Sequence, residues 1–192
     1  MEILETKING LFLIKPRVFG DSRGYFFESF SEREFNSMMK ERTGCTVDFV
    51  QDNESKSIHG VVRGLHFQLP PFTQAKLVRC VRGRVLDVAV DIRKGSPTYG
   101  KHLAVELSED NHMQLFIPHG FAHGFAVLSD EAVFQYKCDN YYHPESDSGI
   151  YMADPLLDID WRIPESKRIL SEKDKLYKSI AELETPFEFK TE

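Results

Sequence analysis

The sequence predicts a mainly β protein, folded as an antiparallel sandwich or barrel with a few short helices at its periphery. Beyond Gly44 the chain divides into short apolar segments separated by glycines, prolines or clusters of Ser, Asp and Glu, with no helical pattern between them. Such segments are typical of antiparallel folds, and 15 Phe and 7 Tyr supply a β-type core. The expected strands lie near residues 46–52, 61–68, 75–81, 84–92, 101–107, 113–117, 122–128 and 131–138.

The two ends of the chain carry further elements. Residues 3–19 predict a strand or a pair of strands broken at the turn signal Asn9-Gly10, and an aromatic strand follows at Tyr25–Phe30. Near the other end, Ser171-x-x-Asp174 resembles a helix N-terminal cap. We therefore expect a closing helix at Glu172–Leu183.

One earlier helix is expected between the aromatic strand and Gly44. Ser31 is followed three residues later by Glu34, which is the pattern of a capping box. The helix should run from about Glu32 to Arg42. Its apolar positions share one stripe, as an amphipathic helix requires; they are Phe35, Met38 and Met39.

Length and composition favour a single domain spanning residues 1–192. The net charge of −6 argues against nucleic acid as the main partner, and no apolar run approaches membrane-spanning length. The N-terminus lacks a secretory signal pattern, and Cys45, Cys80 and Cys138 form no CxxC pair. We expect free thiols in a reducing compartment, which is the cytoplasm.

The stretch with the strongest chemical signal combines Arg63, His66 and Lys76 in apolar strand sequence. Two cations and a titratable base are the groups needed to hold an anionic substrate and remove a proton from it. Strand alternation puts Arg63 and His66 on opposite faces, unless Gly64 forms a bulge that lets both point inward. The alternative is a buried structural histidine beside salt-bridging surface cations. The residues alone leave both readings open.

Two stretches resemble the paired motifs of cupins: Gly60–Gly83, and the Pro-x-Gly-x-x-His pattern of Pro118–His123. Metal-binding cupins place His-x-His and a Glu in the first motif. Here Gln68 replaces the second His, and Gln74 and Lys76 stand where the carboxylate is expected. Two imidazoles beside an ammonium make a poor divalent-ion site, so we expect an organic anion in the barrel, without a metal or another cofactor.

Further runs make the match more specific, and the chain closely resembles the dTDP-4-dehydrorhamnose 3,5-epimerase family over nearly its whole length. The resemblance implies a metal-free cupin-type jelly roll, a homodimer, and a dTDP-4-keto-6-deoxyhexose substrate whose carbons 3 and 5 are inverted in dTDP-L-rhamnose biosynthesis. The matching runs are Pro16–Gly24, Phe49–Asn53, Arg63–Gln68, Lys76–Arg79, Asp87–Asp91, Ile117–Phe125, Gln135–Lys137 and Leu170–Asp174.

The resemblance also assigns catalytic roles. It makes His66 the base, Asp174 the carboxylate that pairs with it, Tyr136 the proton donor, and Lys76 the cation at the ketone oxygen. Each residue has a structural alternative: a packed core histidine, a helix cap, a core tyrosine and a solvated lysine, respectively. His123 is similar to a second active-site histidine that contacts substrate, and orienting a strand is an equal alternative.

The remaining family positions concern the nucleotide. Arg23 and Arg63 match contacts to the diphosphate, a task suited to the forked guanidinium group, and Tyr142 matches an aromatic residue that stacks on thymine. Other matches near the substrate are Glu28, Gln51, Asn53, Asp147 and Lys173.

The chain departs from the family pattern at Met152 and Ala153, which replace an Asn-Asp pair. Because such a change could reshape the sugar pocket, two further readings stay open. One is a mono-epimerase or 3,4-ketoisomerase on the same sugar, and the other is a cupin that binds a nucleotide sugar without turnover. A metal dioxygenase cupin is a more distant alternative.

Overall fold

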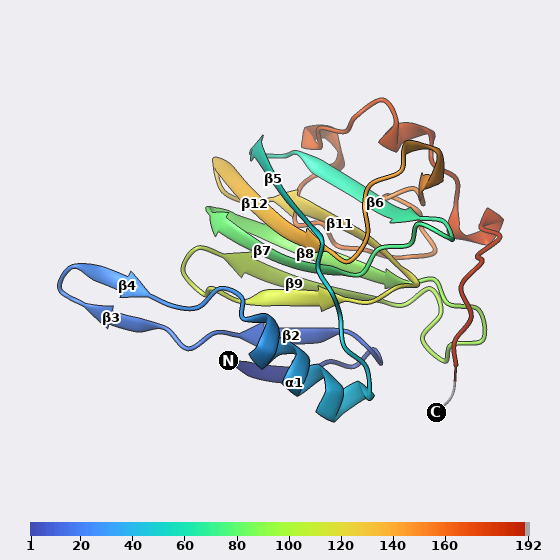
Figure 1. Cartoon of the computed structure of the whole chain (residues 1–192). Helices are drawn as coiled ribbons and strands as arrows, with labels where there is room; N and C mark the ends of the chain where they lie inside the picture. The colour runs from blue at the N-terminus through green and yellow to red at the C-terminus, as the bar shows by residue number, and fades with distance from the viewer. Residues whose placement is uncertain (191–192) are drawn as a thin grey trace.

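The computed structural model describes residues 1–190 and has two antiparallel sheets packed face to face (Figure 1). This is the sandwich that the sequence predicts, in the cupin-type jelly-roll arrangement. The strands are β1 (Glu2–Glu5), β2 (Phe12–Lys15), β3 (Phe19–Asp21), β4 (Gly24–Phe26), β5 (Gln51–Ile58), β6 (Val62–Gln68), β7 (Lys76–Arg82), β8 (Arg84–Asp91), β9 (His102–Ser108), β10 (Gln114–Ile117), β11 (Phe121–Val127), β12 (Glu131–Cys138) and β13 (Asp147–Gly149).

The first sheet has the strand order β1-β2-β10-β7-β12-β5, and the second has the order β13-β6-β11-β8-β9. The core between them contains Val78 and Phe134 from the first sheet and Ala89 and Phe125 from the second. Strands β3 and β4 pair only with each other, as a hairpin that projects from the body of the molecule (Figure 1).

Each sheet is also covered on its outer side. Helix α1 (Glu32–Thr43) packs Phe35 and Met39 against Phe12 and Phe116 of the first sheet. The chain beyond residue 150 packs Trp161 and other apolar side chains against the second sheet. This double coverage explains why β11 is buried at every position, including His123.

The predicted helix is confirmed, with ends set by local chemistry. The Ser31 hydroxyl accepts a hydrogen bond from the Glu34 amide, and Gly44 takes the left-handed conformation that closes the C-terminus. The strand pair broken at Asn9-Gly10 is also confirmed, as β1 and β2. The aromatic strand is shorter than expected, because it ends at Phe26 as one arm of the projecting hairpin.

The strand predicted at 46–52 is wrong, since the strand here is the later segment β5. Its sequence is polar because it is an edge strand of the first sheet with mostly exposed or half-buried side chains. The apolar residues Val47 and Phe49 instead pack against α1. The Asn36 side chain of that helix bonds both backbone groups of Val47, so the segment runs along the helix rather than into the sheet.

The predicted closing helix at Glu172–Leu183 is also wrong. Two separate 3-10 turns lie there, η3 (Asp174–Leu176) and η4 (Ile180–Glu182), and two more are η1 (Pro144–Ser146) and η2 (Glu165–Lys167). The expected cap bond from the Asp174 amide to Ser171 forms. The first turn, η3, does not continue into a helix because the chain becomes extended at Tyr177. The Lys178 carbonyl accepts a hydrogen bond from the Tyr151 amide instead of from a helical neighbour. None of the helices within residues 1–190 is both long and apolar enough to span a bilayer.

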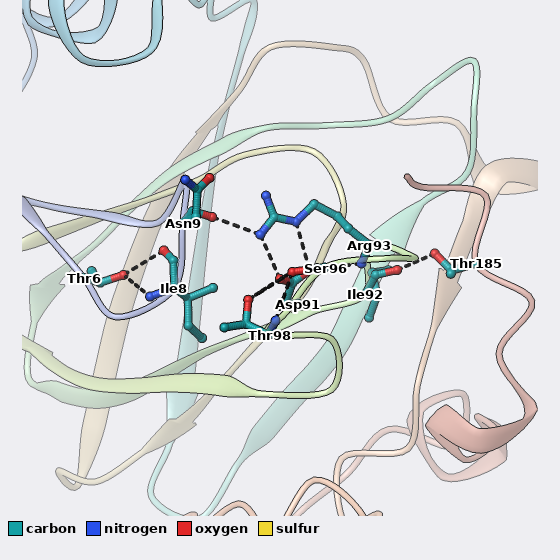
Figure 2. A network of polar contacts seen from close by, with 9 residues as sticks. All are labelled: Thr6, Ile8, Asn9, Asp91, Ile92, Arg93, Ser96, Thr98 and Thr185. Atoms are coloured by element: carbon teal, nitrogen blue, oxygen red, sulfur yellow. Dashed lines mark hydrogen bonds and ion pairs between the residues drawn. The ribbon is translucent and has the colours of Figure 1, made fainter. Parts of the chain in front are cut away.

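A buried ion pair joins the end of β8 to the turn between β1 and β2 (Figure 2). The Asp91 carboxylate is fully buried and accepts hydrogen bonds from the Arg93 guanidinium at 2.8–2.9 Å, from Ser96 at 2.6 Å and from Thr98 at 2.7 Å. Arg93 also donates to the Asn9 carbonyl at 2.9 Å, in the turn between β1 and β2. The pair therefore fixes the end of β8 to the N-terminal hairpin.

We expect Asp91→Asn to lower the free energy of unfolding by about 3–5 kcal/mol at neutral pH, because it leaves the largely buried Arg93 without its counter-charge. Urea unfolding measures this difference. The control is Glu5→Gln, which breaks the exposed pair with Arg42 and should cost less than about 1 kcal/mol. Equal losses of unfolding free energy in the two variants would contradict the stabilising role given to the Asp91–Arg93 pair.

The same variant should change the acid sensitivity of the fold. Burial raises the pKa of the Asp91 carboxyl, but hydrogen bonds from Arg93, Ser96 and Thr98 outweigh it and hold the pKa below its ordinary value of 3.8. A lowered pKa gives stability that is present above the ordinary value and is lost as the pH falls through the folded value. Below about pH 4 the native protein should therefore lose stability more steeply than Asp91→Asn.

Candidate active site

A cavity of about 360 Å³ opens between the two sheets, and both sheets contribute to its wall. This volume is within the range of small-ligand sites. Most of the lining side chains are polar or titratable, in contrast to the apolar core next to them. They are Gln51, Asn53, Lys76 and Tyr136 from the first sheet, His66, Phe67, Gln68 and Asp147 from the second, and Gln74 and Tyr142 from loops.

His66 lies in this wall with a carboxylate behind it. Its Nε2 is 2.7 Å from Oδ1 of Asp174, a residue 108 positions later in the chain, and the Asp174 side chain is 4% exposed. Burial raises the pKa of Asp174, but the hydrogen bond and charge of His66, with donors from Gly64 and Ser171, bring the net pKa below its ordinary value. The carboxylate is therefore ionised at neutral pH and orients the imidazole.

Two glycines position His66. The pairing of β6 with β11 shifts register between Arg63 and His66, so the predicted bulge forms, but it does not bring Arg63 into the cavity wall as expected. At this point the strands approach so closely that a Cβ on Gly64 would lie 2.6 Å from Gly124 Cα, and one on Gly124 would lie 2.5 Å from the Arg63 carbonyl. Arg63 lies outside the cavity wall and donates from Nε to Ser57 at 3.1 Å. Its positive charge partly opposes the rise in the pKa of Tyr136 that burial causes.

Tyr136 belongs to β12, in the sheet that faces His66. Burial raises the pKa of its phenol, so the neutral form that can donate a proton is favoured. The Lys76 ammonium lies 5.7 Å from the centre of the Tyr136 ring and has no ion-pair partner among residues 1–190. Loss of water around it lowers the pKa of Lys76, which the carboxylates of Asp147 and Asp87 partly oppose.

The expected nucleotide contacts Gln51, Asn53, Tyr142 and Asp147 all line the cavity. The Tyr142 hydroxyl donates to Asp147 at 2.9 Å, and Lys173 forms an ion pair with the same carboxylate. Although burial lowers the pKa of Lys173, the Asp147 carboxylate outweighs it and raises the net pKa. A cation and an aromatic ring are thus held together at this end of the cavity.

His123 lies next to the cavity but not in its wall. It is opposite His66 in the register of β11 with β6, is 7% exposed, and places Nε2 2.8 Å from Asp87. Asp87 has its second oxygen buried without a hydrogen-bond partner. His123 therefore supports the strand beside the base, which is the alternative that the sequence left open, and its expected contact with substrate remains a prediction.

Besides Arg63 and His123, two further expected site residues are not brought to the cavity of this chain. Arg23 is at the tip of the projecting β3–β4 hairpin, is 87% exposed, and pairs with Asp21. Glu28 follows that hairpin and is also exposed. Neither residue lines the cavity.

Sequence analysis did not assign four residues that lie at the site. Gln68, Gln74 and Phe67 line the cavity, and the Tyr177 ring packs edge-on against His66 with centroids 5.7 Å apart. The replacement of expected metal ligands by Gln68 and Gln74 was the available signal, because it left two amide side chains without a role; Gln68 is buried and Gln74 half-buried. The departures Met152 and Ala153 do not line the cavity; Met152 is buried in the core under Trp161.

The arrangement suits proton transfer on an anionic ligand. A carboxylate-supported imidazole and a neutral phenol belong to facing sheets, and cations lie close to them. Within residues 1–190, no three His, Cys, Asp or Glu side chains converge as a metal site would require.

Comparisons with known proteins agree with this geometry. A family model described as dTDP-4-dehydrorhamnose 3,5-epimerase matches residues 5–182. The dTDP-4-dehydrorhamnose 3,5-epimerase of Escherichia coli K12 is 53% identical over 184 residues, which cover 95% of this chain and 96% of the relative.

The chain is also similar to solved structures of epimerases. The Elizabethkingia anophelis epimerase is 51% identical with a TM-score of 0.87, covering 93% of this chain and 96% of that one. The 3,5-epimerase of Legionella pneumophila, in complex with dTDP-4-keto-L-rhamnose, is 47% identical with a TM-score of 0.91 and covers 99% of both chains. With a family model matched over most of its length and relatives at about half identity, the chain belongs to the dTDP-4-dehydrorhamnose 3,5-epimerase family.

Proposed function

We propose that this chain, acting as one domain, inverts carbons 3 and 5 of dTDP-4-dehydro-6-deoxy-D-glucose to give dTDP-4-dehydro-L-rhamnose. The observation that carries the proposal is the His66–Asp174 pair in a cavity wall that Tyr136 also forms from the facing sheet. Family membership supports the same reaction. The proposed role is a step in dTDP-L-rhamnose biosynthesis.

His66 is the proposed base. Carbons 3 and 5 are adjacent to the C4 ketone, so breaking either C–H bond leaves its electron pair delocalised onto the ketone oxygen as an enolate. The unperturbed pKa of an imidazole is close to working pH, which suits reversible proton removal. Asp174 stabilises the imidazolium that forms, since its lowered pKa keeps it charged.

Tyr136 and Lys76 complete the proposed step. The phenol of Tyr136 donates its proton to the opposite face of the same carbon, and the C–H bond re-forms with inverted configuration. Lys76 stabilises the enolate oxygen, and its ammonium is effective because little water competes for it. Proton exchange with solvent then returns His66 and Tyr136 to their starting forms.

The nucleotide end of the substrate is proposed to contact Gln51, Asn53, Asp147 and Lys173, with thymine stacked on Tyr142. Arg63 is the proposed diphosphate contact, for which its exposed guanidinium is available. His123 is proposed to contact the sugar. No cofactor takes part in this scheme.

We also propose that the protein is a homodimer in the cytoplasm, in which Arg23 and Glu28 act at the partner's cavity. The projecting hairpin exposes Phe19, Tyr25 and Phe26, which an interface would cover. The free thiols of Cys45, Cys80 and Cys138 are consistent with a reducing compartment.

The first test concerns the base. His66→Asn should lower kcat by about 10²–10⁴-fold, because an amide cannot accept the proton. Steady-state kinetics measures this against His59→Asn, the same change at an exposed histidine outside the cavity, which should leave kcat unchanged. Retention of most activity in His66→Asn would show that another group is the base.

Solvent deuterium distinguishes the proposed reaction from its alternatives. The Tyr136 proton exchanges with water, so each inverted carbon should gain one deuterium from heavy water. NMR of the product should show exchange at both carbons 3 and 5. Exchange at one carbon alone would indicate a mono-epimerase or, if the ketone has moved to carbon 3, a 3,4-ketoisomerase. No exchange with tight dTDP binding would indicate a non-catalytic binding protein.

Mixed dimers test whether Arg23 acts on the partner. An Arg23→Ala chain and a His66→Asn chain, refolded together in equal amounts, should regain about a quarter of native activity. Half of the dimers are mixed, and each has one cavity with an intact His66 and a native Arg23 from the other chain. If Arg23 acts within its own chain, every cavity carries a defect and mixing restores nothing.

A further inference from the structure

Gln68 is a buried amide at the cavity wall to which neither the sequence nor the proposed reaction gives a role. It is 5% exposed and lies on β6, two residues after His66. A buried side-chain amide is costly unless its donor and acceptor groups are satisfied. Its hydrogen-bond partners therefore indicate what it does.

Those partners are backbone groups on either side of Tyr142. The Gln68 Nε2 donates to the Tyr141 carbonyl at 3.2 Å, and its Oε1 accepts from the His143 amide at 2.7 Å. Nε2 also donates to the Phe72 carbonyl at 2.6 Å. The side chain of Gln68 thus brackets one residue of the β12–β13 connection and ties it to the loop after β6.

A second glutamine completes the bracket. Gln51 accepts from the Tyr142 amide itself at 3.1 Å. The His143 ring stacks on Phe72 with centroids 3.4 Å apart. Three consecutive backbone positions, 141–143, are consequently held by side chains in a segment that belongs to no strand.

Tyr142 itself remains accessible on this fixed backbone. Its side chain lines the cavity and the residue is 51% exposed, while its hydroxyl is held by Asp147. An exposed aromatic ring on an unsupported loop would lose conformational freedom when a ligand stacked on it, and this loss would weaken binding. Here the backbone is ordered before the ligand arrives.

We propose that Gln68 is a positioning residue that presets Tyr142 for the nucleobase of the substrate. The inference rests on the proposed function, in which Tyr142 stacks on thymine. Gln68 acts through Tyr142 on binding and takes no part in proton transfer, although it is on the same strand as the base.

The test is a double-variant cycle on dTDP binding, measured by calorimetry. Gln68→Met keeps the length of the side chain and removes its hydrogen-bonding groups, and should weaken binding about tenfold. In a Tyr142→Ala background the same change should cost little more, because the ring it positions is gone. Gln135→Met, on the other side of the sheet from this loop, is the matched control and should bind as the native chain.

Kinetics provides the second readout. Gln68→Met should raise KM and leave kcat within about twofold, since the imidazole and the phenol are untouched. Amide hydrogen exchange should show faster exchange at Tyr142 and His143 and unchanged exchange in β6. A general loss of folding would instead speed exchange throughout the sheet.

Several outcomes would overturn the proposal: native affinity in Gln68→Met, a loss that adds fully to that of Tyr142→Ala, or a fall in kcat with KM unchanged. If Gln68→Met fails to fold, Gln68→Glu replaces it. That variant keeps the acceptor for the His143 amide, but it loses both donors and places a carboxylate oxygen against the Phe72 and Tyr141 carbonyls. It should bind dTDP more weakly than the native chain while exchange at His143 stays slow; native affinity would contradict the inference. Failure of the native chain to bind dTDP would count against the proposed function itself.

Discussion

The hydrogen bond between His66 and Asp174 is the contact on which the site depends, because it joins a strand of the second sheet to a segment 108 residues later. The carboxylate is buried and ionised, and it can stay so only while the imidazole and two further donors satisfy it. The chain after residue 150 covers the outer side of the second sheet and brings Asp174 to this position. The packing of the C-terminal segment on the second sheet therefore also orients the imidazole of His66.

The two-sheet sandwich places the proposed base and the proposed proton donor on facing sheets. A base and a proton donor must reach opposite faces of one carbon atom to invert it. His66 and Tyr136 belong to strands of different sheets, so the separation of the sheets sets the distance between them. The close approach of Gly64 to Gly124 fixes the local path of β6 and thus the direction of the imidazole.

Comparison of the expectations with the structure shows where local sequence information fails. The strands from β6 to β12 follow the predicted segments within a residue or so, because their apolar runs pack in the core, whereas the short polar strand β13 was not predicted. The strand predicted at 46–52 fails because the apolar residues Val47 and Phe49 pack against α1 and not in the sheet, whereas the edge strand β5 is polar. The closing helix fails because Asp174 and Ile180 turn inward and Tyr151 takes a backbone carbonyl of the segment.

The sequence by itself determined the sheet architecture, which follows from apolar periodicity. Its resemblance to a known family, carried by several matching runs, indicated most of the residues in the cavity wall. Only the tertiary structure decided which of those residues meet. It separated Arg23 and Glu28 from the cavity of their own chain, paired His123 with Asp87, and gave Gln68 its bracket around Tyr142. Contacts between residues distant in sequence depend on how the sheets and loops pack, which no local pattern encodes.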